Sequence, residues 1–229
     1  MNTEEMKAYS LISMGSDTRP VEQRLSVRRG QTLPARDGAW RILRGWAAQQ
    51  RHLSDRRQTV ALLISGDLAP EVSHHYDVVA LTDLELVRLH HTANDDVLAL
   101  AEAARGRLID HAARLAGYGA YERMGDLLLE IYQRLRTAGL TTGLRFPFPI
   151  GQEQLGNMLG MSAVHVNRTL AKLRAEGHLL TGSGWYALPN PDRLRIRVVT
   201  GGDVAWSGRS PTSSVTPLRP ASDAMQSAG

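Results

Sequence analysis

Cysteine is absent from this chain of 229 residues. Disulfides, thiolate-ligated zinc and iron–sulfur clusters are therefore excluded. No apolar run is long enough to span a bilayer, and the first residues, MNTEEMKAYS, lack the basic-then-apolar layout of a signal peptide. These absences predict a cytoplasmic protein with no membrane partner.

Several signatures of enzymes are missing as well. The sequence has no cysteine nucleophile, no glycine-rich phosphate loop and no spaced metal-ligand set such as HExxH. We therefore expect no enzyme, no catalytic residues, no metal and no cofactor. The 27 Lys and Arg exceed the 23 Asp and Glu to give a net charge of +4, which permits nucleic-acid binding without establishing it. A chain of this length can hold two modest domains, each with its own core.

The most informative stretch runs from Pro149 to Leu188. Its spacing predicts two short helices, Gln152–Leu159 and Ala163–Glu176, separated by Gly160-Met161-Ser162. Apolar residues recur at intervals of three and four, so each helix has one apolar face turned toward the other. These residues are Leu155, Leu159, Val166, Leu170 and Leu173.

Four small or polar residues predict how these helices begin, meet and end. Gly156 is small where the first helix passes close to the second, and Gly160 can take the positive φ of a tight turn. Ser162 is a natural N-cap for the second helix. Gly177 stands where a left-handed C-cap is expected.

Two short strands are predicted after these helices. His178–Thr181 and Trp185–Leu188 flank Gly182-Ser183-Gly184, which is typical of a tight hairpin. A helical pair followed by such a hairpin, which would be the wing, predicts a winged helix-turn-helix.

The second helix has two different sides on a helical wheel. Val166, Leu170, Leu173 and Ala163 form one side, and Val164, Arg168, Ala171, Lys172 and Ala175 form the other. Small residues allow close approach to the major groove, and Arg and Asn can make bidentate contacts with base edges. A generic αα-hairpin with a solvated polar face is the alternative. The predicted DNA-binding residues are Gln152, Ser162, Ala163, Val164, His165, Asn167, Arg168 and Lys172.

These residues also carry a family resemblance. The segment QEQLGNMLGMSAVHVNRTLAKLRAEGHL closely resembles the helix-turn-helix of bacterial Crp/Fnr-type transcription regulators, the family of the cyclic-AMP receptor protein. GYGAYERMGDLLLEIYQRLRTAGL resembles the segment that precedes this motif in the family, and GDLAP and VVALTDLELVRL resemble the end of its β-roll. The resemblance covers roughly Leu25 to Leu188.

The resemblance implies both a fold and a function. The fold would be α+β, with an N-terminal antiparallel β-roll of the cyclic-nucleotide-binding type, a long dimerisation helix and a C-terminal winged helix-turn-helix. The function would be that of a homodimeric regulator reading an inverted-repeat operator, with RNA polymerase as a further candidate partner. Arg168 matches the family position whose arginine typically reaches a guanine. Ala163 and Val164 stand where well-known relatives carry Arg and Glu, so the half-site should differ.

The rest of the chain divides by pattern. Short segments ending in Gly or Asp predict an antiparallel sandwich or roll, and the resemblance favours the roll. The pattern of Glu4–Ile12 predicts a short helix. The composition of Thr200–Gly229, rich in Ser, Pro and Gly, predicts disorder. The expected parts are an N-terminal segment (1–20), a β-roll (21–93), a dimerisation helix (94–118), the winged helix-turn-helix (119–199) and a tail (200–229).

Asn94–Leu115 has heptad spacing, which predicts a helix that pairs with its copy in a second chain. Packing on the β-roll is the alternative, and we expect His111 to make a satisfied polar contact. Gly117-Tyr118-Gly119 predicts a hinge before a helix over Ala120–Ala138. The predicted dimer-interface residues are Val97, Ala101, Ala104, Leu108, His111 and Leu115.

The part of the β-roll that binds the effector in cyclic-nucleotide-binding relatives departs from the family pattern in this sequence. In cyclic-nucleotide-binding relatives, an Arg and a Ser or Thr hold the cyclic phosphate after a Gly-Asp or Gly-Glu. Here Gly66-Asp67-Leu68-Ala69 begins in the same way, but His74 and His75 fall where that pair would lie, with Glu71 nearby. We therefore expect no cyclic-AMP dependence, and the effector stays unidentified.

The histidine pairs His74-His75 and His90-His91 suggest a metal or haem site as an alternative. Adjacent residues of a strand point to opposite faces, so neither pair can chelate as a unit, although a haem needs only one axial histidine. We expect turn or surface histidines. Two other functions stay open: a haem- or small-molecule-sensing regulator, and an enzyme with a histidine–carboxylate site and a helical oligomerisation module.

Overall fold

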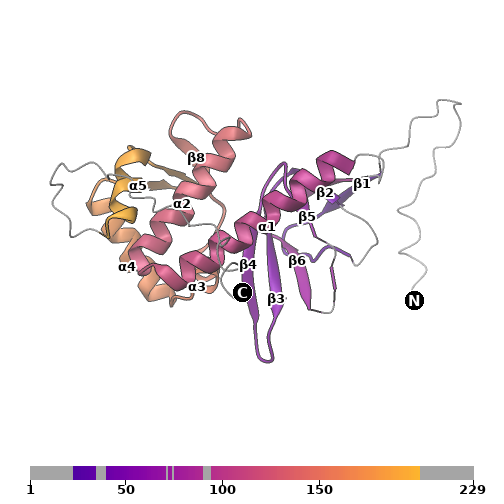
Figure 1. The fold of residues 1–229 in the computed structure, drawn as a ribbon, viewed down its shortest axis with the longest axis horizontal. Coiled ribbons are helices and arrows are strands. Elements are labelled where there is room, and N and C mark those ends of the chain that lie inside the picture. Colours follow the sequence, from indigo (N-terminus) through magenta and orange to yellow (C-terminus); the bar gives the residue numbers. More distant parts are fainter. Residues whose placement is uncertain (1–22, 35–39, 71, 74, 90–93, 202–229) are drawn as a thin grey trace, which may run out of the picture.

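The computed structural model describes residues 23–34, 40–70, 72–73, 75–89 and 94–201, with the side chains of 94–96 excepted (Figure 1). The predicted helix Glu4–Ile12, most of the predicted tail and the side chains of His74, His90 and His91 lie outside this part. Within it, no helix combines the length and the apolar character needed to cross a membrane.

The N-terminal part is an antiparallel roll of two sheets, which confirms the predicted architecture. One sheet has the strand order β1-β7-β2-β5, and the other has the order β4-β3-β6. Apolar residues of both sheets form a common core between them, in which Ile42 and Leu86 are fully buried. The strands are β1 (Arg24–Val27), β2 (Trp40–Arg44), β3 (Ala47–His52), β4 (Arg57–Leu63), β5 (Leu68–Ala69), β6 (Tyr76–Ala80) and β7 (Leu84–Arg88).

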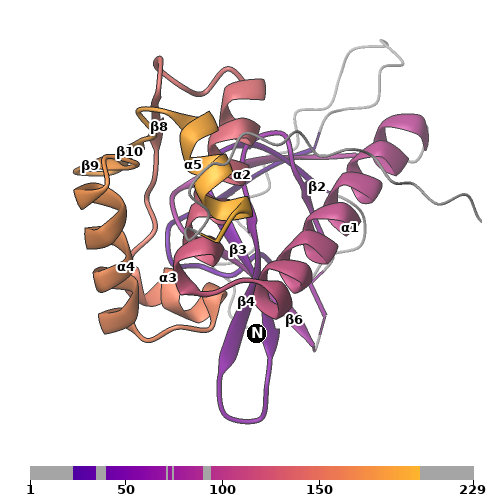
Figure 2. The ribbon, with the colours of Figure 1, turned by 60° about the vertical axis from the view of Figure 1, so that its left-hand side comes forward.

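Two helices follow the roll and meet at a break. Helix α1 (Asn94–Gly117) lies along the roll, against β4 and β5. Helix α2 (Ala120–Thr137) follows it, and Arg134 near the end of α2 donates to the carbonyl of Leu62 on β4 (Figure 2). The helical pattern breaks at Tyr118-Gly119, within the segment predicted to interrupt it, and α2 ends within one residue of its predicted end. Apolar residues recur at helical spacing along α2 and are buried: Met124, Leu127, Leu128, Ile131 and Leu135.

The members of the predicted heptad seam of α1 differ in exposure along the helix. Ala101 and Leu108 are exposed, whereas His111 is buried within the single chain. The other three members, Val97, Ala104 and Leu115, are half-buried. Several exposed apolar residues of α1 form a stripe that overlaps one edge of this seam: Leu98, Ala101, Leu108, Ile109 and Ala112.

His111 does not make the satisfied contact that was expected. Its Nδ1 is buried and finds no hydrogen-bond partner among the described residues. Burial, aided by the positive charge of Arg114, lowers the pKa of His111 below its ordinary value. The histidine is therefore a neutral core residue at pH 7.

The C-terminal part contains the predicted helix-turn-helix and wing. Helices α3 (Gln152–Leu159) and α4 (Ala163–Ala175) agree with prediction to within one residue. Strands β9 (Leu180–Gly182) and β10 (Trp185–Ala187) form the expected hairpin, and α5 (Pro191–Val199) packs beside α2. Strand β8 (Arg145–Pro147), which pairs with β10, was not predicted.

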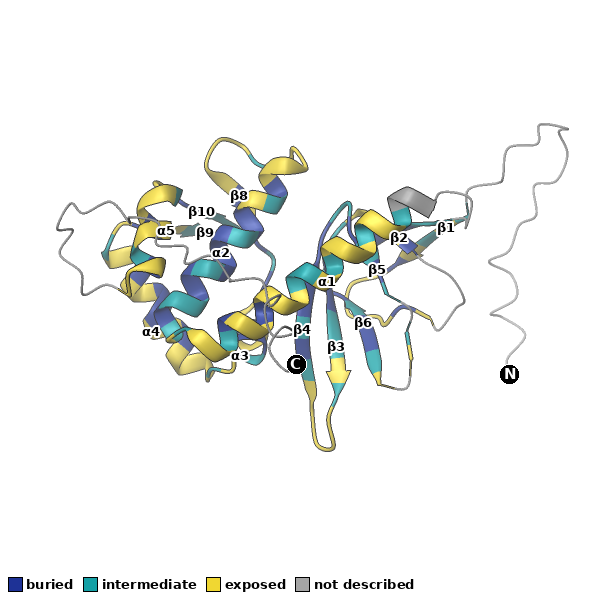
Figure 3. Ribbon diagram, viewed as in Figure 1, coloured by how far each residue is buried: buried dark blue, intermediate teal, exposed yellow. Residues whose placement is uncertain are grey.

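The two ends of the molecule share one apolar core, which the sequence did not predict. The core of the C-terminal part extends into the roll through Trp46, and the Trp46 and Phe148 rings meet edge to face with centroids 6.2 Å apart. Figure 3 shows the buried bands along α2 and along β4. The roll residues in this core are Trp46, Ala48, Leu62, Ile64 and Leu81.

Candidate nucleic-acid interface

The turn between α3 and α4 is built from the residues that the sequence singled out. Gly160 has φ +66°, a left-handed conformation that side chains disfavour. A Cβ at Gly156 would lie 2.5 Å from the carbonyl oxygen of Met161, so only glycine allows this approach. The hydroxyl of Ser162 accepts a hydrogen bond from the backbone N–H of His165 at 3.3 Å, which confirms the predicted N-cap.

Helix α4 is anchored along one side. Val166, Leu170 and Leu173 are at most 1% exposed, as predicted. Ala163 was expected beside them but is exposed. It occupies the first turn of α4, where the chain has just left α3 and no other element covers it.

The opposite side of α4 faces solvent. Val164 is 62% exposed, and Arg168 and Lys172 are exposed beside it. Gln152 and Ser162, from α3 and the turn, are exposed too. All eight predicted DNA-binding residues are accessible, since Ala163, His165 and Asn167 are also exposed.

A cleft of about 620 Å³ adjoins this exposed face. Val164, Arg168 and Lys172 line it from α4, while Tyr121 and Arg197 line it from α2 and α5. The surface beside the exposed side of α4 is thus concave and rich in basic side chains, which suits a phosphate backbone.

Tyr121 organises the charges in this cleft, a role that the sequence analysis missed. Its hydroxyl donates to Glu176 at 2.6 Å, and the Lys172 ammonium lies 5.1 Å from the ring centroid. The Arg197 guanidinium lies 4.5 Å from the same centroid. Burial, followed by the bond to Glu176, raises the pKa of Tyr121, so the hydroxyl stays protonated. Tyr121 and Glu176 therefore hold the two cations near α4.

The wing carries a further cation that the sequence analysis missed. The guanidinium carbon of Arg145 on β8 lies 4.2 Å from the Trp185 ring centroid on β10. The hairpin turns at Ser183-Gly184, where Gly184 has φ +73°. Because β8 was not predicted, Arg145 could not be placed beside the wing.

An internal ion cluster lies at Gly66-Asp67-Leu68-Ala69, the segment that begins like the phosphate-binding part of the relatives. Asp67 is 8% exposed and accepts a hydrogen bond from the backbone N–H of Ile64 at 2.7 Å. Its carboxylate also pairs with Arg107 of α1 at 3.2 Å and with Arg134 of α2. His75 is exposed, and no cluster of three or more metal-ligating side chains occurs in the described part of the chain.

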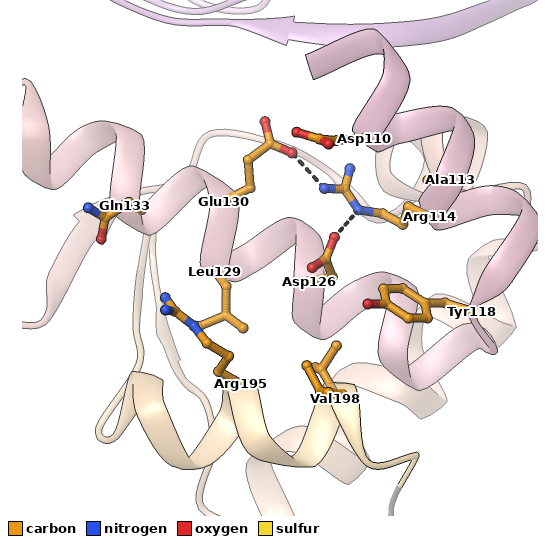
Figure 4. A pocket seen from close by; sticks show the side chains of 11 residues that line it. Asp110, Ala113, Arg114, Tyr118, Asp126, Leu129, Glu130, Gln133, Arg195 and Val198 are labelled. Carbon is orange, nitrogen blue, oxygen red and sulfur yellow. Dashed lines mark hydrogen bonds and ion pairs between the residues drawn. The ribbon is translucent and has the colours of Figure 1, made fainter. Parts of the chain in front are cut away.

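A second cleft of about 620 Å³ lies between α1, α2 and α5 (Figure 4). In it, Arg114 of α1 is 2% exposed and donates to Asp126 at 2.7 Å and Glu130 at 2.6 Å, both on α2. Burial alone would lower the pKa of Arg114, but Glu130 and Asp126 outweigh it and raise that pKa. Arg114 is therefore charged and ties α1 to α2 across the hinge.

Comparisons with known proteins agree with this geometry. Residues 122–197 match the family of Crp-like helix-turn-helix domains. No curated protein matches the sequence significantly.

Solved structures share the fold. The chain is similar to FixK2 from Bradyrhizobium japonicum, with 23% identity, a TM-score of 0.66 and coverage of 77% of this chain and 97% of that one. It is similar to TTHA1359, a Crp/Fnr-family transcriptional regulator from Thermus thermophilus, with 19% identity, a TM-score of 0.60 and coverage of 77% and 98%. A CooA variant from Carboxydothermus hydrogenoformans shows 14% identity, a TM-score of 0.60 and coverage of 77% and 88%. Residues 122–197 are thus a Crp-like helix-turn-helix domain, and the chain that carries it has the fold of the Crp/Fnr regulators.

Proposed function

We propose that the protein is a cytoplasmic, homodimeric and sequence-specific regulator of transcription, which reads an inverted-repeat operator with residues 163–176. The observation that carries this proposal is the reading face of α4. One side of α4 is apolar and packs inward, and the opposite side is exposed and carries small and basic residues. This helix lies within a Crp-like helix-turn-helix domain.

Arg168 is the best-placed base reader. It lies near the middle of the exposed side of α4, where a guanidinium can make two hydrogen bonds to a guanine edge. Val164 lies one turn earlier and can contact a thymine methyl group. Lys172 lies one turn later, beside Glu176 and Tyr121, and is better suited to a phosphate.

A dimer would place two reading helices on one duplex. The exposed apolar stripe of α1 is the surface that supports this, because Leu98 and Ile109 are 62% and 54% exposed. Helices with such a stripe bury it against a partner, and the simplest partner is the same helix of a second chain. Two half-sites would then lie about one helical turn, roughly 34 Å, apart.

Cyclic AMP is not the effector in this proposal. Asp67, in the segment Gly66–Ala69 where the relatives' phosphate-binding part begins, is already paired with Arg107 and Arg134 inside the protein. The Arg-Ser pair that holds a cyclic phosphate in the relatives is missing from the sequence. A cyclic phosphate would therefore find no strong cationic partner there.

The test is selection of bound duplexes from a randomised pool by the full chain. An inverted repeat should be enriched, and failure to enrich any sequence would contradict the proposed function. Arg168→Ala should then weaken binding to the selected operator by about 1–3 kcal/mol and leave binding to scrambled duplex nearly unchanged.

Lys172→Ala on the same helix is the matched control. If Lys172 contacts phosphate, this variant should weaken binding to both duplexes alike and reduce the salt slope by about one unit. Equal losses on both duplexes for Arg168→Ala would instead make Arg168 a backbone contact.

A further inference from the structure

The outer edge of β4 faces helix α3 of the DNA-binding domain. Among the strands that the structure describes, β4 is the last of its sheet and pairs only with β3. Figures 1 and 2 both show α3 beside it. Thr59 on this strand is 2% exposed, so its backbone N–H cannot rely on water. A buried edge group of this kind requires a partner within the protein.

Asn157 of α3 supplies that partner. Its side-chain Oδ1 accepts from the backbone N–H of Thr59 at 2.6 Å, and its Nδ2 donates to the carbonyl of Arg57 at 2.8 Å. The carboxamide therefore bonds to β4 as a residue of a parallel strand would, at the two groups that flank Gln58.

The contact is reciprocal. The side-chain amide of Gln58 donates to the backbone carbonyl of Asn157. This carbonyl belongs to the last turn of α3, where carbonyls lack a partner within the helix. The edge of the strand and the end of the helix thus satisfy each other.

Movement of α3 would carry the reading helix with it. Leu155 and Leu159 of α3 are fully buried in the same core as Val166 of α4. The reading side of α4 stays exposed in this arrangement, so the contact with β4 does not cover it. The contact can hold the reading helix in place without blocking it.

We propose that Asn157 is a positioning residue for DNA reading, because it fixes the orientation of α3 and α4 relative to the β-roll. In a dimer, the roll and α1 would carry this orientation to the second protomer and so set the distance between the two reading helices. This last step rests on the proposed function, whereas the orientation itself does not.

The experiment compares Asn157→Ala with Gln154→Ala in the full chain. Gln154 caps the same helix by accepting from the backbone N–H of Gly151 at 3.0 Å, and it has no hydrogen bond to the described residues of the roll. Because the chain has no cysteine, spin labels can be attached at Glu85→Cys on the roll and Ala175→Cys on α4. The Asn157→Ala variant should show a broader label–label distance distribution, and the Gln154→Ala variant should not.

The second measurement uses DNA. Wild type should bind the selected operator more tightly than a version with one base pair inserted between the half-sites. In Asn157→Ala this preference should shrink by about 3- to 10-fold, a range expected for loss of a coupling contact. Gln58→Ala should change both measurements in the same direction, which covers the case in which Asn157→Ala does not fold.

The outcomes separate the two proposals. Unchanged label distances in both roll-contact variants would overturn the role of Asn157. Broader distances with an unchanged spacing preference would overturn its role in DNA reading. If wild type selects no inverted repeat, the proposed function fails, and the label distances alone decide whether Asn157 holds the domain in place.

Discussion

Replacing Asp67 by Asn tests whether the ion cluster between the roll, α1 and α2 contributes to stability. The substitution removes one negative charge but keeps an oxygen that can accept the hydrogen bond from Ile64. The Asp67 side chain is 11% exposed, and the side chains of its partners Arg107 and Arg134 are 17% and 16% exposed. Loss of the carboxylate therefore leaves two largely buried guanidiniums with less negative charge nearby to offset their positive charge.

The expected loss of stability depends on the ion-pair partners that the arginines keep. Removing one partner of a buried ion pair costs about 3–5 kcal/mol. Arg134 keeps Glu130 at 3.0 Å, so the loss should be smaller than that range at its upper end. We expect Asp67→Asn to lower the free energy of unfolding by about 2–4 kcal/mol. For a chain of this size, that corresponds to a melting temperature roughly 4–16 °C lower.

The assay is urea and thermal unfolding of wild type and variant at pH 7. Glu102→Gln is the matched control, since Glu102 pairs with Arg105 at 2.6 Å but both side chains are more than half exposed. An exposed pair contributes at most about 1 kcal/mol, so this control should be nearly neutral. Equal, small losses for both variants would show that Asp67 does not join the three elements.

Three further predictions concern the dimer, the effector and pH. Leu108→Glu should release monomers in light scattering, because a charge buried against its symmetry mate costs several kcal/mol or more; an unchanged dimer would contradict the α1 interface. Millimolar cyclic AMP should leave the melting temperature unchanged, whereas a ligand at a hundred times its Kd would add about 2.7 kcal/mol of stability. Burial lowers the pKa of His111, so its stabilising contribution is present above the unfolded pKa of about 6.5 and is lost as pH falls below it. Wild type should therefore lose stability more steeply than His111→Gln between about pH 7.5 and 5.5, and identical slopes would exclude this role.

The helix-turn-helix could be predicted closely because its signals are local. Gly160 and Ser162 define the turn and the N-cap with their own backbone and side-chain chemistry. The apolar spacing of the two helices needs no information from elsewhere in the chain. Element boundaries in this region therefore agreed with prediction to within about one residue.

Strand β8 could not be predicted in the same way. It has three residues, includes Pro147, and pairs Arg145 with Ala187, far along the chain. A proline within a short segment normally argues against a strand, and is tolerated here at the edge of the sheet. Only the pairing partner makes β8 a strand, and the partner is not visible in the local pattern.

The buried arginines escaped prediction for a related reason. Arg114 and Arg134 lie on helices where basic residues usually face solvent. Arg114 is buried and Arg134 is largely covered because carboxylates from another element meet them after the helices pack. Sequence spacing shows which face of a helix is apolar, but it does not show which acid from a distant segment will cover a charge.

Arg114, Asp67 and Asn157 are among the side chains that link the roll, α1, α2 and α3, and such contacts constrain how a signal could reach DNA. Arg114 joins α1 to α2, Asp67 joins the roll to both helices, and Asn157 joins the roll to α3. A change in the roll can alter DNA binding only if it changes the relative free energy of arrangements that these contacts distinguish. The coupling is reciprocal, so operator DNA must change the affinity of any effector by the same factor that the effector changes the affinity for DNA. If an effector binds the roll, it can therefore be sought by its tighter or weaker binding to the operator-bound form.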